Sequence, residues 1–163
     1  MGKAPIFIAA ERNLVSIAKI LLQNVANVNI KDVNLNTTLH TAAEYGYLEM
    51  VEMLITKGAE IAGKDYLGRT PLHRANEKTT EILIQNGAKV DAIDKRGDTP
   101  IHQVSNPWHG KSKVLKLMRY GASLKIRNKN GLTPVECALK EIAIYSFDVR
   151  MPYFKAISYN EMM

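Results

Sequence analysis

Apolar residues recur with a helical period between positions 48 and 55. Leu48, Val51, Leu54 and Ile55 fall at i, i+3, i+6 and i+7, which places them on one face of an amphipathic helix. The small pair Ala42-Ala43 lies a short distance before them and allows a preceding helix to approach a neighbour closely. Two helices are therefore predicted, and neither can bury its apolar face without further units packed beside it.

Glycine residues mark the ends of these predicted helices. Gly46 permits a tight turn between them, and Gly58 ends the second one in the left-handed conformation, which glycine adopts without a steric penalty. Gly87 and Gly121 are placed to do the same later in the chain. The Asp65-Tyr66-Leu67-Gly68 segment reads as a turn that joins one unit to the next.

A tetrapeptide returns at the start of each unit. It reads Ala4-Pro5-Ile6-Phe7, Thr37-Thr38-Leu39-His40, Thr70-Pro71-Leu72-His73, Thr99-Pro100-Ile101-His102 and Thr133-Pro134-Val135-Glu136. Successive copies are 33, 33, 29 and 34 residues apart, and a period of about 33 is typical of stacked repeat solenoids. The threonine can cap the following helix, and proline fits at the first helical position because the N–H that it lacks is not needed there.

The recurring motif resembles that of the ankyrin-repeat family, over residues 4–139. The resemblance implies an all-α ankyrin-repeat solenoid of helix-turn-helix units with short β-turn or hairpin connections. Repeats are expected to start near residues 4, 37, 70, 99 and 133, within an array that occupies 1–140. We expect the aromatic-rich residues 141–163 to form a C-terminal capping segment packed on the last repeat.

Several repeats depart from the family pattern. Phe7 stands where histidine is usual, Val25 where glycine is usual, and Leu35 replaces a turn glycine, which leaves the conformation of that turn open. The third repeat lacks four residues between positions 75 and 81, close to one helical turn, so we expect shortened helices and not a broken repeat. In the fourth repeat Pro107 should end the first helix.

The resemblance also implies where a partner binds. Ankyrin repeats bind proteins mainly through the tips of their turns and the exposed positions of the first helix, which line a concave groove. These positions are Val33, Asn34, Asn36, Glu44, Tyr45, Tyr66, Leu67, Arg69, Lys95, Arg96, Asp98, Lys129, Asn130 and Leu132. Tyr45, Tyr66 and Leu67 are apolar or aromatic where the scaffold does not require it, so we expect them to converge on one contact patch.

Positive charge is concentrated in one segment. The formal net charge is +6, and residues 111–129 hold seven basic residues and no acidic one. This basic stripe consists of Lys111, Lys113, Lys116, Arg119, Lys125, Arg127 and Lys129. Trp108 and His109 precede it and are also expected to contact the partner. We expect Lys113 and Lys116 on a solvated face. The stripe is either a solubilising surface or a site for an acidic protein, with anionic lipid or nucleic acid as weaker alternatives.

Catalytic and metal chemistry are not predicted. The sequence shows no phosphate-binding glycine loop, nucleophile elbow or His-Glu-x-x-His pair. In the family, the motif histidines His40, His73 and His102 tie the helix start to neighbouring backbone, and successive repeats lie too far apart for histidine pairs to share one zinc ion. We expect no enzyme, metal, cofactor, small-molecule substrate or membrane span. The single cysteine, Cys137, is expected to be a buried thiol in a reduced compartment.

The sequence thus predicts a non-catalytic protein–protein interaction module, cytoplasmic, and either a monomer or a fragment of a longer array. Two alternatives stay open. The frequent Asn, Ile, Lys and Tyr have AT-rich codons, which suits a host-interacting effector or viral ankyrin protein acting in a host cytosol. The chain could also be the recognition fragment of a larger enzyme.

Overall fold

The computed structural model describes residues 4–24, 26–104 and 111–145, and these residues form helices, turns and connecting loops. The helices in chain order are α1 (Pro5–Glu11), α2 (Val15–Gln23), α3 (Thr38–Tyr45), α4 (Leu48–Thr56), α5 (Pro71–Arg74), α6 (Glu77–Gln85), α7 (Lys111–Arg119) and α8 (Pro134–Tyr145). Within the described ranges the β-type pairing is an isolated bridge between Lys31 and Thr37.

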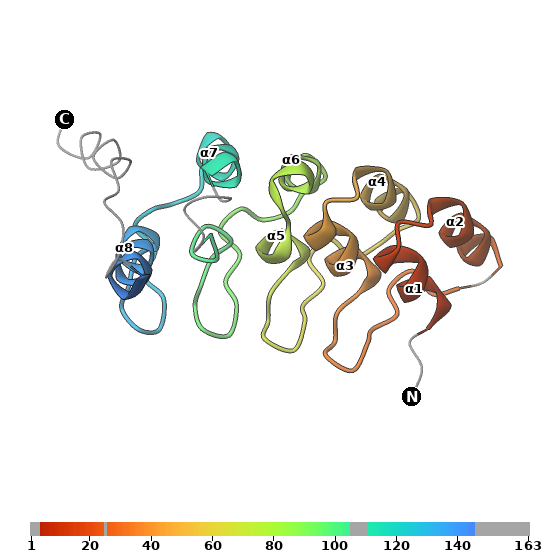
Figure 1. Ribbon diagram of the computed structural model, residues 1–163, viewed down its shortest axis with the longest axis horizontal. Coiled ribbons are helices and arrows are strands. Elements are labelled where there is room, and N and C mark those ends of the chain that lie inside the picture. The colour runs from red at the N-terminus through yellow and green to blue at the C-terminus, as the bar shows by residue number, and fades with distance from the viewer. Residues whose placement is uncertain (1–3, 25, 105–110, 146–163) are drawn as a thin grey trace.

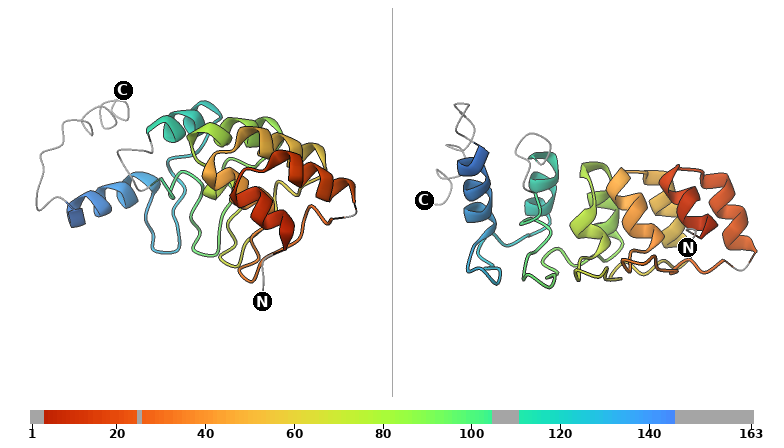
Figure 2. Two further views of the ribbon diagram at one scale, coloured as in Figure 1. Left: turned by 45° about the vertical axis from the view of Figure 1, so that its right-hand side comes forward. Right: turned by 60° about the horizontal axis from the view of Figure 1, so that its bottom comes forward.

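The helices form two rows (Figure 1). The second helices of the repeats (α2, α4, α6 and α7) line the upper edge, the first helices (α1, α3 and α5) lie below them, and long turns project from the opposite edge. Figure 2 shows the same order from two further directions, with the turns as a separate row beside the helices. This arrangement confirms the predicted all-α ankyrin solenoid.

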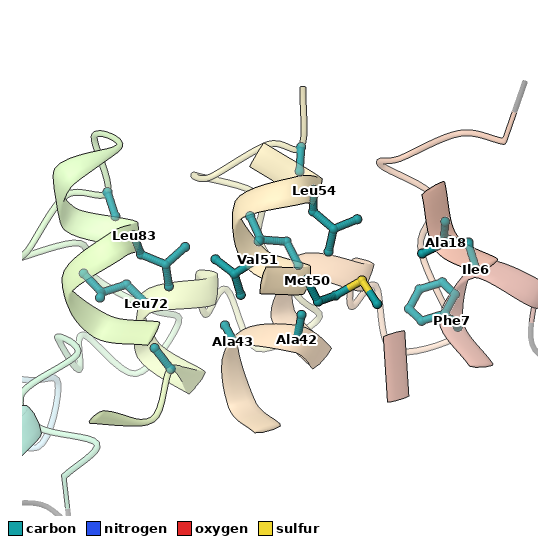
Figure 3. Packing of buried hydrophobic residues seen from close by; sticks show 14 of the residues in the cluster. Ile6, Phe7, Ala18, Ala42, Ala43, Met50, Val51, Leu54, Leu72 and Leu83 are labelled. Carbon is teal, nitrogen blue, oxygen red and sulfur yellow. The ribbon is translucent and has the colours of Figure 1, made fainter. Parts of the chain in front are cut away.

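The first two repeats pack through apolar side chains. Met50, Val51 and Leu54 of α4 are fully buried, and Met50 reaches across to Phe7 of the first repeat (Figure 3). The predicted apolar face was partly wrong, because Leu48 is 44% exposed and Met50 takes the inward position. Both residues are apolar, so periodicity alone could not decide which of them turns toward the neighbouring repeat.

The third repeat is shortened, as predicted. Its first helix, α5, has only four residues. When Gly87 is aligned with Gly58, Thr79 of α6 takes the position of Met50. Thr79 is fully buried, and its hydroxyl donates to the Ala43 carbonyl at 2.7 Å. A hydrogen bond thus replaces part of the apolar contact between repeats at this position.

The fourth repeat departs further from the pattern. Residues 100–103 form a turn where the other repeats begin a helix. The predicted effect of Pro107 lies outside the described residues, as does Val25. When Gly121 is aligned with Gly58 in the same way, Lys113 of α7 takes the position of Met50.

The C-terminal helix crosses the predicted domain boundary. α8 runs from Pro134 to Tyr145, beyond residue 140. Most of the capping segment expected at 141–163 lies outside the described residues, so the cap stays a prediction. No helix in the described part of the chain combines the length and the apolar character needed to cross a membrane.

Candidate functional site

The motif histidines hold each repeat to the next. The Thr37 N–H donates to Nδ1 of His40 at 3.2 Å, so Nδ1 is unprotonated and the Nε2–H donates to the Arg69 carbonyl at 3.0 Å. His73 repeats the pattern toward the Asp98 carbonyl at 3.0 Å, and His102 toward that of Leu132 at 3.2 Å. These contacts give the histidines the structural role that the family resemblance implied.

Burial lowers the pKa of His40 and of His73 below the ordinary histidine value, and hydrogen bonds to the neighbouring carbonyls partly oppose this effect. Both imidazoles are therefore neutral at pH 7. In the last repeat a carboxylate replaces the imidazole, since Glu136 Oε2 accepts the Thr133 N–H at 2.7 Å. This bond is the first cause of the lowered pKa of Glu136, whose ion pair with Arg127 contributes less.

An inward carboxylate shapes each of the first three turns. In the second turn Asp65 Oδ1 accepts the N–H groups of Leu67 and Arg69, both at 2.9 Å, and Oδ2 accepts from Arg69 Nε at 2.8 Å. Burial raises the pKa of Asp65, but the bonds and charge of Arg69 outweigh it, so the net shift is downward. Asp32 and Asp94 take the same place in their turns, and Asn128 takes it in the fourth.

One main-chain hydrogen bond joins each turn to the next. The N–H groups of Tyr66, Lys95 and Lys129 donate to the carbonyls of Asn34, Leu67 and Arg96 at 2.9, 2.9 and 2.8 Å. The turns therefore form a continuous row, which we call the turn row and define as residues 32–36, 65–69, 94–98 and 128–132. A main-chain contact therefore links every pair of neighbouring turns in the row.

The conformation of the first turn is now settled. Leu35 has a φ of 58°, in the left-handed region, where Gly68 and Gly97 have φ values of 79° and 76°. A Cβ atom added at either glycine would lie 3.0 Å from the N atom of the next turn. The first turn thus keeps the family geometry with a non-glycine residue at a strained position.

Most of the predicted turn residues are accessible. Val33 is 89% exposed and Tyr66 is 53% exposed. The side chains of Asn34, Lys95, Arg96, Lys129 and Asn130 are also exposed, whereas those of Asn36, Leu67, Arg69 and Leu132 are partly buried. The prediction omitted two exposed apolar residues, Leu35 at 46% and Ile93 at 52%. Aligning the four turns would have found both.

Asp98 was predicted wrongly as an exposed turn residue. It is 8% exposed, and its Oδ1 atom accepts from Nδ2 of Asn128 at 2.7 Å. Its carboxylate therefore braces two consecutive turns from the inside and is not available to a partner.

The first-helix positions also differ from expectation. Glu44 forms an ion pair with Arg74. Tyr45 is 54% exposed but stacks on Tyr47, with ring centroids 5.6 Å apart, so the scaffold does use its ring. Tyr45 is the last residue of α3, whereas the N–H of Tyr66 bonds to Asn34 in the turn that precedes α3. The eight residues of α3 span about 12 Å, and this length separates the two tyrosines. The two tyrosines therefore mark the ends of a strip and not a single pocket.

The basic stripe does not form one surface. α7 lies in the row of second helices, and Lys125, Arg127 and Lys129 lie in or beside the fourth turn, at the opposite edge (Figure 1). Residues that are neighbours in the sequence are therefore divided between two faces. Trp108 and His109 lie outside the described residues.

Lys113 was predicted wrongly on a solvated face. It is 7% exposed, and its Nζ atom donates to the His73 carbonyl at 3.0 Å. This carbonyl lies in the last turn of the short helix α5, where no further helical N–H can reach it. Burial lowers the pKa of Lys113 to about 8. Lys116 is partly buried and donates to the Glu77 carbonyl at 2.7 Å. Arg119 is exposed.

A cluster of Asp98, His102 and Cys137 brings three possible metal-ligand atoms within 4.8 Å of one another. His102 Nδ1 accepts the Thr99 N–H at 3.1 Å, and Nε2 bonds to the Leu132 carbonyl at 3.2 Å. Both ring nitrogens are thus engaged in the bonds that hold the repeats together, and a metal would have to break them. Cys137 is only partly buried, contrary to expectation.

Comparison with known proteins identifies the class. A family model described as ankyrin repeats, in three copies, matches residues 6–94, more than half of the 163 residues. The chain therefore belongs to the ankyrin-repeat family. Ankyrin repeats are generally protein-interaction modules.

Curated relatives share only part of this chain. The B-cell lymphoma 3 protein homolog of Mus musculus is 32% identical over 77 residues, which are 47% of this chain and 17% of the relative. The probable E3 ubiquitin-protein ligase XBOS33 of Oryza sativa is 36% identical over 73 residues, 44% of this chain and 14% of the relative. A putative ankyrin repeat protein of Rickettsia bellii is 46% identical over 44 residues, 27% of this chain and 18% of the relative. The match thus spans less than a fifth of each of these relatives.

Proposed function

We propose that this chain is a non-catalytic protein-binding module that holds its partner along the turn row and the exposed end of the first helices. The observation that carries the proposal is the exposure of apolar side chains on a row built by main-chain bonds. Val33 is 89% exposed and Tyr66 is 53% exposed, while the turns beneath them are held by aspartate and main-chain contacts. Aromatic residues in such positions are common anchors of protein interfaces.

The exposure of Ile17, outside the turn row, has a different explanation. Ile17 is 48% exposed on α2, but in the repeat register it corresponds to Met50, which is fully buried against the preceding repeat. Its exposure therefore reflects a stacking position at the N-terminal end of the described array. This explanation does not apply to Val33, because its equivalents in the other turns, Tyr66, Lys95 and Lys129, are exposed and not buried between repeats.

The setting of the module is part of the proposal. The sole cysteine cannot form a disulfide within the chain, which fits a reducing, cytoplasmic compartment. The relatives named as E3 ubiquitin-protein ligases match this chain over only 14% of their length, so their names do not carry a reaction over to this chain. We therefore assign this chain recognition and no reaction.

Affinity purification with the intact chain, followed by mass spectrometry, tests this function. The same purification with Tyr66→Ala is the comparison, and Lys57→Ala, at an exposed site after α4, is the matched control. We expect a partner that wild type and the control retain and that Tyr66→Ala loses at least in part. Equal recovery with all three proteins would move the binding site away from the turn row.

A further inference from the structure

The turn row changes its chemistry along the stack. The first two turns present apolar side chains at their tips, with Val33 89% and Tyr66 53% exposed. The third and fourth turns present cations at the equivalent positions, where Lys95 and Lys129 are exposed, and the exposed Arg96 follows Lys95. The same edge of the molecule therefore has an apolar half and a cationic half.

Leu35 extends the apolar half. It is 46% exposed, and its φ of 58° lies in a region that residues with side chains rarely adopt. The other three turns carry glycine at this position. Strained residues cluster at binding sites, where the side chain has a use that offsets the strain. Leu35 thus supports a role for the exposed aliphatic surface beside Val33.

The acidic residues of the cationic half point inward. Asp94 is buried, and its Oδ1 atom accepts the N–H groups of Arg96 at 2.7 Å and Asp98 at 3.0 Å. Asp98 is buried against Asn128. Within the described part of the chain, the Arg96 guanidinium makes no hydrogen bond or ion pair, and neither does the Lys129 ammonium. These cations are therefore available to a partner.

The two halves meet at the second and third turns. Lys95 Nζ lies 6.0 Å from the ring centroid of Tyr66. A main-chain bond from Lys95 to Leu67 joins these turns, and another from Lys129 to Arg96 joins the third to the fourth. Both halves thus belong to one continuous edge that a single extended segment can follow.

We propose that the turn row binds an extended segment of a partner protein that is apolar at one end and acidic at the other. Its apolar side chains lie over the first two turns, and its carboxylates lie over the third and fourth. The proposal rests on the proposed protein-binding function and specifies the chemistry of the partner. Stacked helices lie about 10 Å apart and an extended strand rises about 3.3 Å per residue, so about nine residues span the four turns.

Nucleic acid fits this edge less well. Tyr66 offers a ring beside the cations, but beyond it the tips are the aliphatic side chains of Val33 and Leu35, on which the next bases of a strand could not stack. An acidic protein segment can place leucine or valine there and gain apolar contact. The division of the edge into two halves therefore favours a bipartite peptide.

Selection from a random 12-residue peptide library on the intact wild-type chain tests this proposal. Recovered peptides are then synthesised with a fluorescent label, and their affinities are measured by anisotropy against three proteins. These are wild type, Arg96→Glu with Lys129→Glu, and the control Lys57→Glu with Lys89→Glu. The control changes the net charge equally, at exposed residues after α4 and α6. A DNA duplex of 20 base pairs serves as a competing polyanion.

We expect peptides with an apolar cluster and an acidic cluster separated by several residues. Binding should weaken at least tenfold in Arg96→Glu with Lys129→Glu and change by less than twofold in the control. Val33→Ser should weaken it severalfold, because the apolar end loses its contact.

Four results would overturn the proposal. Peptides without acidic residues, or peptides that bind both double mutants equally, would reject the acidic partner and leave the protein-binding function standing. Tighter binding of the DNA duplex than of any peptide would assign the cations to nucleic acid. Failure to recover any peptide, together with no captured protein in the affinity purification, would reject the proposed function itself.

Discussion

The row of second helices and the turn row carry similar residues and use them differently. Lys113 of α7 is 7% exposed and donates to a main-chain carbonyl, whereas Arg96 and Lys129 of the turn row are exposed. The apolar residue Met50 of α4 is fully buried, whereas Val33 of the first turn is 89% exposed. Position in the repeat, and not residue type, decides which side chains stabilise the stack.

This comparison changes how the basic segment is read. Residues 111–129 look like one charged stripe in the sequence, but the structure divides them between the two rows. A cation at the Met50 position faces the preceding repeat and is desolvated, and a cation at a turn tip faces solvent. The following predictions test this division, in order of decreasing expected effect.

Lys113→Glu should cause the largest loss of stability. It would replace a buried donor by a carboxylate next to the His73 carbonyl, which amounts to an unpaired buried charge. We expect a loss of about 3–5 kcal/mol in the free energy of unfolding, measured by urea denaturation. Arg96→Glu, the matched charge reversal in the turn row, should change it by no more than about 0.5 kcal/mol. Similar losses of stability in Lys113→Glu and Arg96→Glu would contradict the division of the cations between a buried and an exposed row.

Leu54→Ala should destabilise the row of second helices through a cavity. Leu54 is fully buried between repeats, so its truncation should cost about 2–5 kcal/mol. Each repeat contacts only its neighbours, so the unfolding transition should also broaden as the two halves uncouple. Thermal melting followed by circular dichroism measures both effects. A melting curve like that of wild type would contradict the assigned packing.

Lys113 should make stability depend on alkaline pH. Its pKa is about 8 in the folded protein and 10.5 in the unfolded chain, so the unfolded state binds more protons between these values. Stability should therefore rise with pH, by about 2 kcal/mol between pH 7 and 9.5. Lys113→Met should abolish this rise, because the thioether does not titrate. A rise of the same size in Lys113→Met would assign the effect to other groups.

Acidification should weaken the histidine contacts between repeats. The pKa values of His40 and His73 are lowered in the folded protein, so their contribution to stability is complete above about pH 6.5 and is lost as the pH falls below it. His40→Gln should be less stable than wild type at pH 7 and should lose less stability between pH 7 and 5. Urea denaturation at several pH values measures the difference, and parallel losses in the two proteins would argue against a titrating His40.

Much of the fold could be read from the sequence because the repeat motif fixes local geometry. The threonine and histidine positions, the left-handed glycines and the shortened third repeat were predicted correctly. The inward position of Lys113 was not predicted because a lysine on an amphipathic helix is ordinarily solvated, although alignment of Gly121 with Gly58 places Lys113 at the position of Met50. The stacking of Tyr45 on Tyr47 depends on three-dimensional packing and has no such signal.

The candidate site was predicted less completely. The turn tips follow from the motif, so Val33, Tyr66 and Arg96 were found. Asp98 follows the same pattern yet is buried, because Asn128 of the next turn donates to it. That contact joins residues 30 positions apart, and the sequence of one turn does not reveal it.

Site-specific photo-crosslinking tests most directly whether the turn row is the working surface. A benzophenone amino acid would replace Tyr66 in the turn row or Leu115 of α7, which is similarly exposed at 55%. Each protein would be irradiated in cell lysate and its adducts resolved by mass spectrometry. The account predicts a discrete protein adduct from position 66 and none of the same identity from position 115. An adduct from position 115 alone would place the binding surface on the row of second helices and contradict the account.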